Sequence, residues 1–390
     1  MQRVRVRVST ARQEAYEIII GAGTLARLGD VARRSLSPHV RRLVIVSNQK
    51  VFSLYGERAA QSLREEGFSI AHWLMGDGER YKTAATLTRL LAFFSESGLE
   101  RSDAVVALGG GVVGDLAGFA AAVYLRGIAF LQVPTTLLAQ VDASVGGKVA
   151  VNTSAGKNLI GAFHHPRAVL IDTNTLQSLP PREMTAGWCE SIKQGAAGDR
   201  HLFDGTCSFL RHHTLDTALA RKQGLERLIA AQVAFKASIV AGDEREELTR
   251  NDHRSRRILN FGHTIAHALE SITRYRRFRH GEAVGYGMLV AGEISKRLGL
   301  LATSELELLR DAVRLCGRLP RADDLREDEI LSRIAHDKKM IDGQLNWVLL
   351  ERIGRARIVE GREIERRLLR SSLRAGLKNI SEKRKSEGEV

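Results

Sequence analysis

A run of glycines between a predicted strand and a predicted helix constrains the fold of this chain more than any other segment. Residues 104–108 form an unbroken apolar run, typical of a buried strand, and lead directly into Gly109-Gly110-Gly111-Val112-Val113-Gly114-Asp115. In a strand–turn–helix unit, this G-x-G-x-x-G spacing lets backbone amides approach a pyrophosphate at the positive end of the helix. A tight turn without a ligand is the alternative, because no acidic residue ends a second strand about 20 residues later, as the simple fingerprint expects.

Apolar runs on both sides of this unit predict the rest of a sheet. Residues 43–46, 128–133 and 168–171 have the composition of buried strands, and helical stretches lie between them. This alternation, which continues to about residue 175, predicts a Rossmann-like α/β domain with a mostly parallel sheet.

Beyond about residue 181 the strand pattern gives way to helical periodicity, as in residues 225–240 and 265–269. Leu179-Pro180-Pro181 marks the boundary, because proline ends elements and opens helices. We expect an α/β domain over residues 1–178 and a mainly α-helical metal-binding domain over residues 179–375, with a small hairpin around Ile353-Gly354. Residues 376–390 are expected to form a disordered tail, because their end is charged and polar.

Length and composition agree with two domains and limit the class of protein. A chain of 390 residues, 44% of them hydrophobic, can bury two cores, and a cleft between two domains is the usual place for a small-molecule site. The formal charge of +14 raises nucleic-acid binding as an alternative, but the basic residues are dispersed and no nucleic-acid-binding module is recognisable. The three cysteines form no CxxC pair, and no segment reaches the ~18 apolar residues of a membrane span, so we expect a soluble cytoplasmic protein without nucleic-acid or membrane partners.

Three histidines point to an enzyme. His263 and His267 lie at positions i and i+4 and share one helix face, and His280 follows them. An open catalytic metal site needs about three protein ligands of this kind, although a single buried histidine is more often a hydrogen-bonded core residue. The basic run at residues 274–279 would attract an anionic substrate if it lines that site, although such runs are more often solvated.

Other polar residues lie where α/β sheets bind ligands, after the carboxyl ends of strands. Lys148, Lys157 and Asn158 lie among glycines, are flanked by segments 149–151 and 159–163 that we expect to be buried, and suit phosphate or carboxylate oxygens. Upstream of the glycine loop, two carboxylates and a lysine could hold an adenosine ribose. The residues predicted to bind a nucleotide cofactor are Asp77, Glu79, Lys82, Gly109, Gly110, Gly111, Val112, Gly114, Asp115, Thr135 and Thr136.

These segments, in this order, resemble the 3-dehydroquinate synthases, a family of sugar phosphate cyclases. The resemblance runs from about residue 48 to residue 354 and rests on residues 77–79, 109–115, 134–138, 142–148, 156–163, 190–193, 260–270, 280–288 and 337–339. It implies NAD as cofactor and one divalent metal, zinc or cobalt, bound by Glu190, His263 and His280. His267 is then implied to take part in proton transfer rather than to bind the metal.

The resemblance also implies a reaction of the shikimate pathway of aromatic amino-acid biosynthesis. In it, 3-deoxy-arabino-heptulosonate 7-phosphate is oxidised at C5 by NAD, loses phosphate by β-elimination, is reduced again and closes to 3-dehydroquinate by an aldol step. The residues implied to be catalytic are His267, Lys148, Asn158, Lys193 and Asp142. The cations implied to bind the carboxylate and phosphate are Arg126, Lys157, Arg256 or its neighbour Arg257, and Lys338 or Lys339.

Some features depart from the family pattern or leave alternatives open. Trp188-Cys189 precede Glu190 where small or aliphatic residues are usual, and Ala266 stands where glycine is common, but neither change removes a ligand. Another cyclase, such as a 2-deoxy-scyllo-inosose synthase, would share the cofactors, whereas a metal-dependent polyol dehydrogenase would release NADH. Lys148, Lys157 and Asn158 favour a small anionic substrate that carries a carboxylate. The resemblance further implies a homodimer.

Overall fold

A six-stranded sheet forms the centre of the first half of the chain in the computed structural model, which describes residues 15–154, 156–212, 218–335, 340–341 and 344–378. The strand order is β1-β8-β5-β4-β2-β3, and every paired strand runs parallel to its neighbour. The strands are β1 (Glu17–Gly21), β2 (Arg42–Asn48), β3 (Ser69–Met75), β4 (Ala104–Gly109), β5 (Ala129–Pro134) and β8 (Ala168–Asp172). The four predicted strands are confirmed as β2, β4, β5 and β8. The two that the sequence did not reveal, β1 and β3, are the edges of the sheet, where a continuous apolar run is not required.

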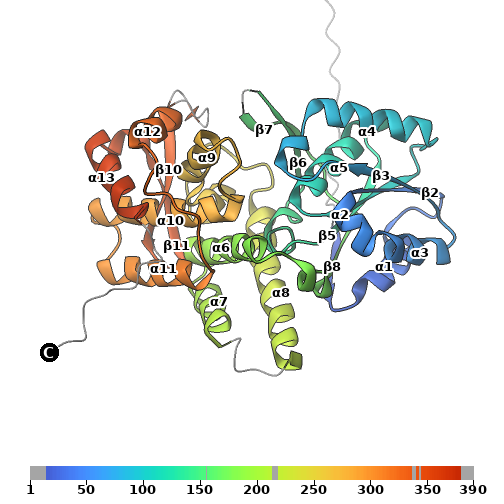
Figure 1. Ribbon diagram of the computed structural model, residues 1–390, viewed down its shortest axis with the longest axis horizontal. Coiled ribbons are helices and arrows are strands. Elements are labelled where there is room, and N and C mark those ends of the chain that lie inside the picture. Colours follow the sequence, from blue (N-terminus) through green and yellow to red (C-terminus); the bar gives the residue numbers. More distant parts are fainter. Residues whose placement is uncertain (1–14, 155, 213–217, 336–339, 342–343, 379–390) are drawn as a thin grey trace, which may run out of the picture.

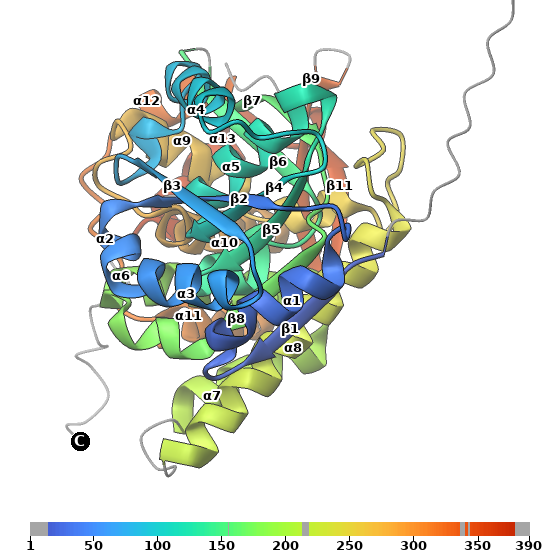
Figure 2. The same ribbon diagram turned by 90° about the vertical axis from the view of Figure 1, so that its right-hand side faces the viewer.

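Both faces of the sheet are buried, which explains the unbroken apolar runs. Leu43 and Ile45 of β2 pack with α1 (Leu28–Ser35) and α3 (Glu57–Glu65), which follows the short α2 (Gln49–Val51). Val44 and Val46 point the other way and pack with α4 (Ala84–Glu96) and α5 (Gly111–Val123). Figure 2 shows these two pairs of helices on opposite sides of the sheet. Because successive side chains of a strand alternate between the faces, covering both faces requires apolar residues throughout.

A hairpin of β6 (Lys148–Thr153) and β7 (Gly156–Phe163) packs beside α5. The expected burial of residues 149–151 is confirmed, since Val149 and Val151 belong to the core under this hairpin. The expectation that residues 159–163 are buried is wrong: Leu159, Ile160 and Phe163 are 54%, 47% and 43% exposed. The reason is that β7 pairs with β6 alone among the described strands and forms the outer edge of the hairpin.

The second half of the chain is mainly helical, as predicted, and lies beside the sheet (Figure 1). A three-stranded antiparallel sheet of order β11-β10-β9 accompanies the helices, and its β10–β11 pair, which turns at Gly354, confirms the predicted hairpin. The elements are α6 (Pro181–Gly198), α7 (Arg200–His212), α8 (Ala218–Gly242), α9 (His263–Ile272), α10 (His280–Arg297), α11 (Thr303–Leu315), α12 (Glu327–Ala335), β9 (Met340–Ile341), β10 (Gln344–Arg352), β11 (Arg355–Glu360) and α13 (Arg366–Gly376).

Helix α10 is central to this half and packs against α6, α9, α11 and α13. Two glycines allow its close approach to its neighbours. A Cβ atom on Gly281 would lie 1.9 Å from the backbone oxygen of Ala186 in α6, and one on Gly287 would lie 2.0 Å from the oxygen of Gly262, which caps α9. Backbone contact at these glycines therefore holds the start of α10 against α6 and the start of α9 against α10.

The two halves share one core. Val169 and Ile171 of β8 pack with Trp188 and Ile192 of α6. The last strand of the large sheet ends at Asp172 and α6 begins at Pro181, on either side of the expected boundary between residues 178 and 179, although the division into domains stays a prediction. The expected tail lies outside the described residues from residue 379 onward. Within the described ranges, no helix combines the length and the apolar character needed to cross a bilayer.

Candidate active site

A cleft of about 1440 Å³ lies between the carboxyl ends of the sheet strands and the helical half. Parallel strands present their carboxyl ends at the same edge, so loops that are distant in sequence meet there. The predicted residues that line the cleft are Asp77, Glu79, Lys82, Gly110, Gly111, Val112, Asp115, Thr135, Thr136, Asp142, Lys148, Lys157, Asn158, Lys193, Arg256, His263, His267 and His280.

The glycine loop forms a cradle at the start of α5, for which Gly110 is the N-cap. A Cβ atom on Gly110 would lie 3.0 Å from Cγ2 of Thr136, and one on Gly111 would lie 3.3 Å from Cβ of Ala143, so side chains here would fill the cradle. Gly114 serves packing instead, because its Cβ would lie 2.3 Å from Nε2 of Gln132 in β5. The hydroxyl of Thr135 is buried without a hydrogen-bond partner. A cradle that side chains would fill, a hydroxyl without a hydrogen-bond partner and a helix N-terminus together fit the diphosphate of a dinucleotide.

Lys82 joins the glycine loop to the hairpin. Its Nζ donates hydrogen bonds to Asp115 Oδ2 at 2.7 Å and to Asn158 Oδ1 at 2.6 Å, and it lies 3.3 Å from Glu79. Burial lowers the pKa of Lys82, but the carboxylates of Asp115 and Glu79 outweigh it, and the pKa is raised. The side chain is 4% exposed, so this ammonium is charged and committed to internal partners at the edge of the cleft.

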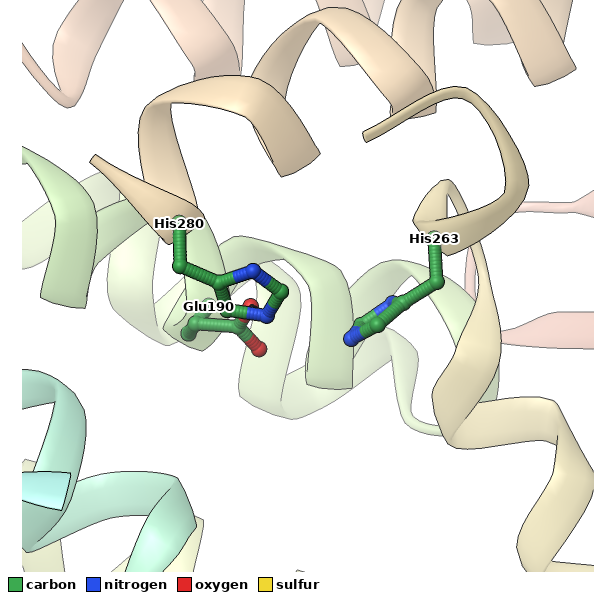
Figure 3. A group of neighbouring side chains, drawn as sticks. All are labelled: Glu190, His263 and His280. Carbon is green, nitrogen blue, oxygen red and sulfur yellow. Dashed lines mark ion pairs between the residues drawn. The ribbon is translucent and has the colours of Figure 1, made fainter. Parts of the chain in front are cut away.

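Three side chains from three helices converge at the other end of the cleft. Glu190 comes from the middle of α6, and His263 and His280 are the first residues of α9 and α10. Figure 3 shows the three side chains pointing toward one another, and their ligand atoms all lie within 4.8 Å of one another. Glu190 Oε2 forms an ion pair with Lys193 Nζ at 2.5 Å, whereas Oε1 is buried without a hydrogen-bond partner. A carboxylate with one oxygen unpartnered, together with two imidazoles, is the donor set of an open catalytic zinc or cobalt site.

A second group, His267, Glu270 and His280, also has ligand atoms within 4.8 Å of one another. Its carboxylate is already satisfied. Glu270 Oε1 accepts a hydrogen bond from Lys157 Nζ at 2.8 Å, and Oε2 lies 3.3 Å from Nδ1 of His280. The geometry therefore favours Glu190, His263 and His280 as the ligands, and it leaves His267 beside them, with its ring 5.5 Å from that of His263.

Three cations that line the cleft each pair with a carboxylate or a carbonyl of the chain. Lys236 Nζ lies 2.8 Å from Asp142 Oδ1, Lys148 forms an ion pair with Glu246, and Arg256 donates to the carbonyl of Gly146 at 2.8 Å. The structure also separates the two candidate arginines. Arg256 lines the cleft, whereas Arg257 donates to Leu248 and Asn251 in the preceding loop.

The structure does not bring every predicted residue into the cleft. Arg126 is exposed at the end of α5, in a turn where Leu125, Arg126 and Gly127 all have positive φ, and it does not line the cleft. Its predicted contact with the substrate gains no support from this position. Lys338 and Lys339 lie outside the described residues.

The polar cleft residues that were not predicted as site residues include Lys236, Glu246, Asn260 and Glu270. For two of them, the sequence contains a pattern that could have indicated the site. Lys236 and Gln232 interrupt the apolar stripe of α8 one turn apart, and Glu270 continues the face of His263 and His267. Glu246, which accepts a hydrogen bond from Asn260 at 2.7 Å, lies in a charged loop where periodicity carries no information.

Comparisons with known proteins agree with this site. The chain matches the family model of the N-terminal part of 3-dehydroquinate synthase over residues 72–186 and that of the C-terminal part over residues 187–340. It is 45% identical to a 3-dehydroquinate synthase from Pelotomaculum thermopropionicum over 351 residues, which cover 90% of this chain and 91% of the relative.

Solved structures of related cyclases have the same fold. A 2-epi-5-epi-valiolone synthase from Streptomyces hygroscopicus with NAD+ and Zn2+ bound is 27% identical, with a TM-score of 0.81 and coverage of 94% of this chain and 98% of that one. A 2-deoxy-scyllo-inosose synthase complexed with carbaglucose-6-phosphate, NAD+ and Co2+ is 28% identical, with a TM-score of 0.79 and coverage of 92% and 96%. From the family models and the identity over nine-tenths of its length, the chain belongs to the 3-dehydroquinate synthase family.

Proposed function

We propose that this protein is a 3-dehydroquinate synthase, a lyase that converts 3-deoxy-arabino-heptulosonate 7-phosphate into 3-dehydroquinate and inorganic phosphate. One observation carries the proposal: His263 and His280 line a cleft with a glycine cradle at a helix N-terminus and several cations, and their ligand atoms and that of the buried Glu190 all lie within 4.8 Å of one another. Family membership supports the same activity.

The residues present fit both cofactors of the related cyclases. Glu190, His263 and His280 would hold zinc or cobalt, and the cradle at Gly110 and Gly111 would hold the diphosphate of NAD. When bound, NAD supplies a reversible hydride acceptor and the metal supplies a Lewis acid that polarises a substrate oxygen.

The cations of the cleft bind and orient the anionic substrate. Lys148, Lys157 and Arg256 line the cleft, where they now pair with carboxylates or carbonyls of the chain. A bound phosphate or carboxylate offers them a second acceptor with full negative charge, so charge-assisted hydrogen bonds hold the substrate in one orientation. Arg126, Lys338 and Lys339 stay predicted contributors.

Two lysine–carboxylate pairs, Lys236–Asp142 and Lys193–Glu190, can donate or accept protons during the reaction. Burial lowers the pKa of Lys236, whose ammonium lies 2.8 Å from Asp142, so this lysine gives up its proton more readily than an ordinary lysine. Lys193 Nζ, next to Glu190, can donate a hydrogen bond to a substrate hydroxyl. A ring nitrogen of His267 can accept a proton from the substrate and return it.

Another sugar phosphate cyclase activity is the second candidate, because the solved cyclases share the fold and bind NAD with zinc or cobalt. Lys148, Lys157 and Asn158 in one cleft favour a substrate that carries a carboxylate as well as a phosphate. The homodimer and the cytoplasmic location stay predictions.

The activity is tested by release of inorganic phosphate from the heptulosonate phosphate, with NAD and zinc or cobalt supplied, while absorbance at 340 nm is followed. We expect phosphate release without accumulation of NADH, because the substrate is reduced again in the same catalytic cycle. Chelation should stop release and added metal should restore it. Accumulation of NADH with polyols, without phosphate release, would assign a dehydrogenase. Absence of both reactions would assign a different cyclase substrate.

Gly111→Val is expected to weaken NAD binding about tenfold or more. The added side chain would fill the cradle and keep the pyrophosphate from the backbone amides, at a cost of about 1–3 kcal/mol. Calorimetric titration with NAD measures the change. Gly205→Val is the matched control, because Gly205 is exposed on α7 with no atom within 4 Å of its ideal Cβ. An unchanged dissociation constant in Gly111→Val would contradict this location of the diphosphate.

A further inference from the structure

Glu270 is a buried carboxylate that touches a candidate metal ligand without being available as a ligand itself. It lies on α9, one turn beyond His267, and its side chain is 3% exposed. Oε2 lies 3.3 Å from Nδ1 of His280, and Oε1 accepts a hydrogen bond from Lys157 Nζ at 2.8 Å. Each oxygen of Glu270 therefore has its own partner.

The two ring nitrogens of His280 face different carboxylates. Nε2 lies 3.6 Å from Oε1 of Glu190, on the side of the other candidate ligands, whereas Nδ1 faces Glu270. A histidine that binds a metal through one nitrogen carries a proton on the other, and an acceptor for that proton fixes both the tautomer and the orientation of the ring. A carboxylate is a stronger acceptor here than a carbonyl, because the hydrogen bond involves a charge.

Lys157 holds Glu270 in this role. Lys157 comes from β7 and Glu270 from α9, so their ion pair crosses the cleft. The ammonium of Lys157 also lies 4.9 Å from the ring centre of Tyr275, which restricts its movement. Glu270 is thus a hydrogen-bond acceptor with a fixed position.

We infer that Glu270 is a positioning residue that holds His280 with Nδ1 protonated and Nε2 directed to the metal, while Lys157 anchors the carboxylate. The inference rests on the proposed metal site and adds to it a residue that acts through His280. Removing the charge of Glu270 should therefore weaken metal binding more than it changes the chemical step.

Glu270→Gln in the full-length protein tests this, because glutamine keeps the size of the side chain and one acceptor oxygen but loses the charge. Competition with a chelator should show that zinc dissociates about 10–100-fold more readily from Glu270→Gln than from the unaltered protein. Phosphate release should be lost at low zinc and largely regained at saturating zinc. Glu293→Gln is the matched control, since Glu293 is a buried carboxylate of α10 that pairs with Arg297 and Arg310 and does not line the cleft.

A zinc dissociation constant of Glu270→Gln within about twofold of the unaltered value would overturn the inference. Failure of the unaltered protein to bind zinc would instead overturn the proposed metal site and the inference with it. If Glu270→Gln does not fold, nitrogen-15 NMR of histidine in the zinc-loaded, unaltered protein decides the question. A proton on Nδ1 of His280 with zinc on Nε2 is expected, and zinc on Nδ1 would overturn the inference.

Discussion

Replacement of His263 by alanine is expected to abolish metal retention and to lower kcat by about 10³-fold or more. His263 is one of three candidate ligands whose atoms lie within 4.8 Å of one another, so its loss leaves one carboxylate and one imidazole. A catalytic metal contributes several kcal/mol of charge stabilisation, and each 1.4 kcal/mol corresponds to about tenfold in rate. Metal content after dialysis and the rate of phosphate release measure the two effects.

His39→Ala is the matched control for this prediction, because His39 is exposed and does not line the cleft. It should keep both metal and activity. Full activity of His263→Ala in a metal-free preparation would show that these three helices do not form the catalytic metal site.

Gly281→Ala is expected to separate His280 from Glu190. A Cβ atom at this position would lie 1.9 Å from the backbone oxygen of Ala186, and neither backbone can yield as a flexible side chain would. Helix α10 must therefore move away from α6, at a cost of about 1–3 kcal/mol in the free energy of unfolding. A shift of about 1 Å at the reacting groups is enough to lower kcat/KM by about 10²-fold. Thermal unfolding, zinc titration and phosphate release together measure these consequences.

The control for Gly281→Ala is Gly205→Ala in the exposed part of α7, where nothing lies within 4 Å of the added Cβ. Alanine should raise the stability there by up to about 1 kcal/mol, because it favours a helix over glycine. Equal melting temperature and zinc affinity for Gly281→Ala and the unaltered protein would show that the close approach of α6 and α10 does not position the ligands.

Sequence patterns predicted the strands correctly where the property that forms the strand is present in the segment itself. Consecutive apolar residues predicted β2, β4, β5 and β8, because a strand that is covered on both faces has no polar side. Residues 159–163 show the limit of this reasoning: they are as apolar as a buried strand, yet β7 lies at the exposed edge of a hairpin. An apolar run shows that a segment can be buried, whereas its actual burial depends on which other elements pack against it in the fold.

In the candidate site too, the sequence could predict some features, whereas others depend on the tertiary structure. The i, i+4 spacing placed His263 and His267 on one face of a helix. It could not decide which of them lies near Glu190, which belongs to a different helix. Lys236 and Glu246 enter the site from α8 and from a loop, and Arg126 stays outside the cleft on the exposed turn after α5. Motif position alone could not distinguish these outcomes, because each depends on the path of the intervening chain.

By itself the sequence determined the strand–turn–helix unit, the order of the α/β and helical halves, and a set of residues able to bind a dinucleotide and a metal. Those features follow from periodicity, glycine spacing and side-chain chemistry, which are properties of short segments. Only the tertiary structure decided that Oε1 of Glu190 is left without a hydrogen-bond partner while both oxygens of Glu270 have one, and that Arg256 rather than Arg257 lines the cleft. The physical reason is that α6, α9 and α10 meet through backbone contacts at Gly281 and Gly287, and contacts between distant segments have no local pattern in the chain.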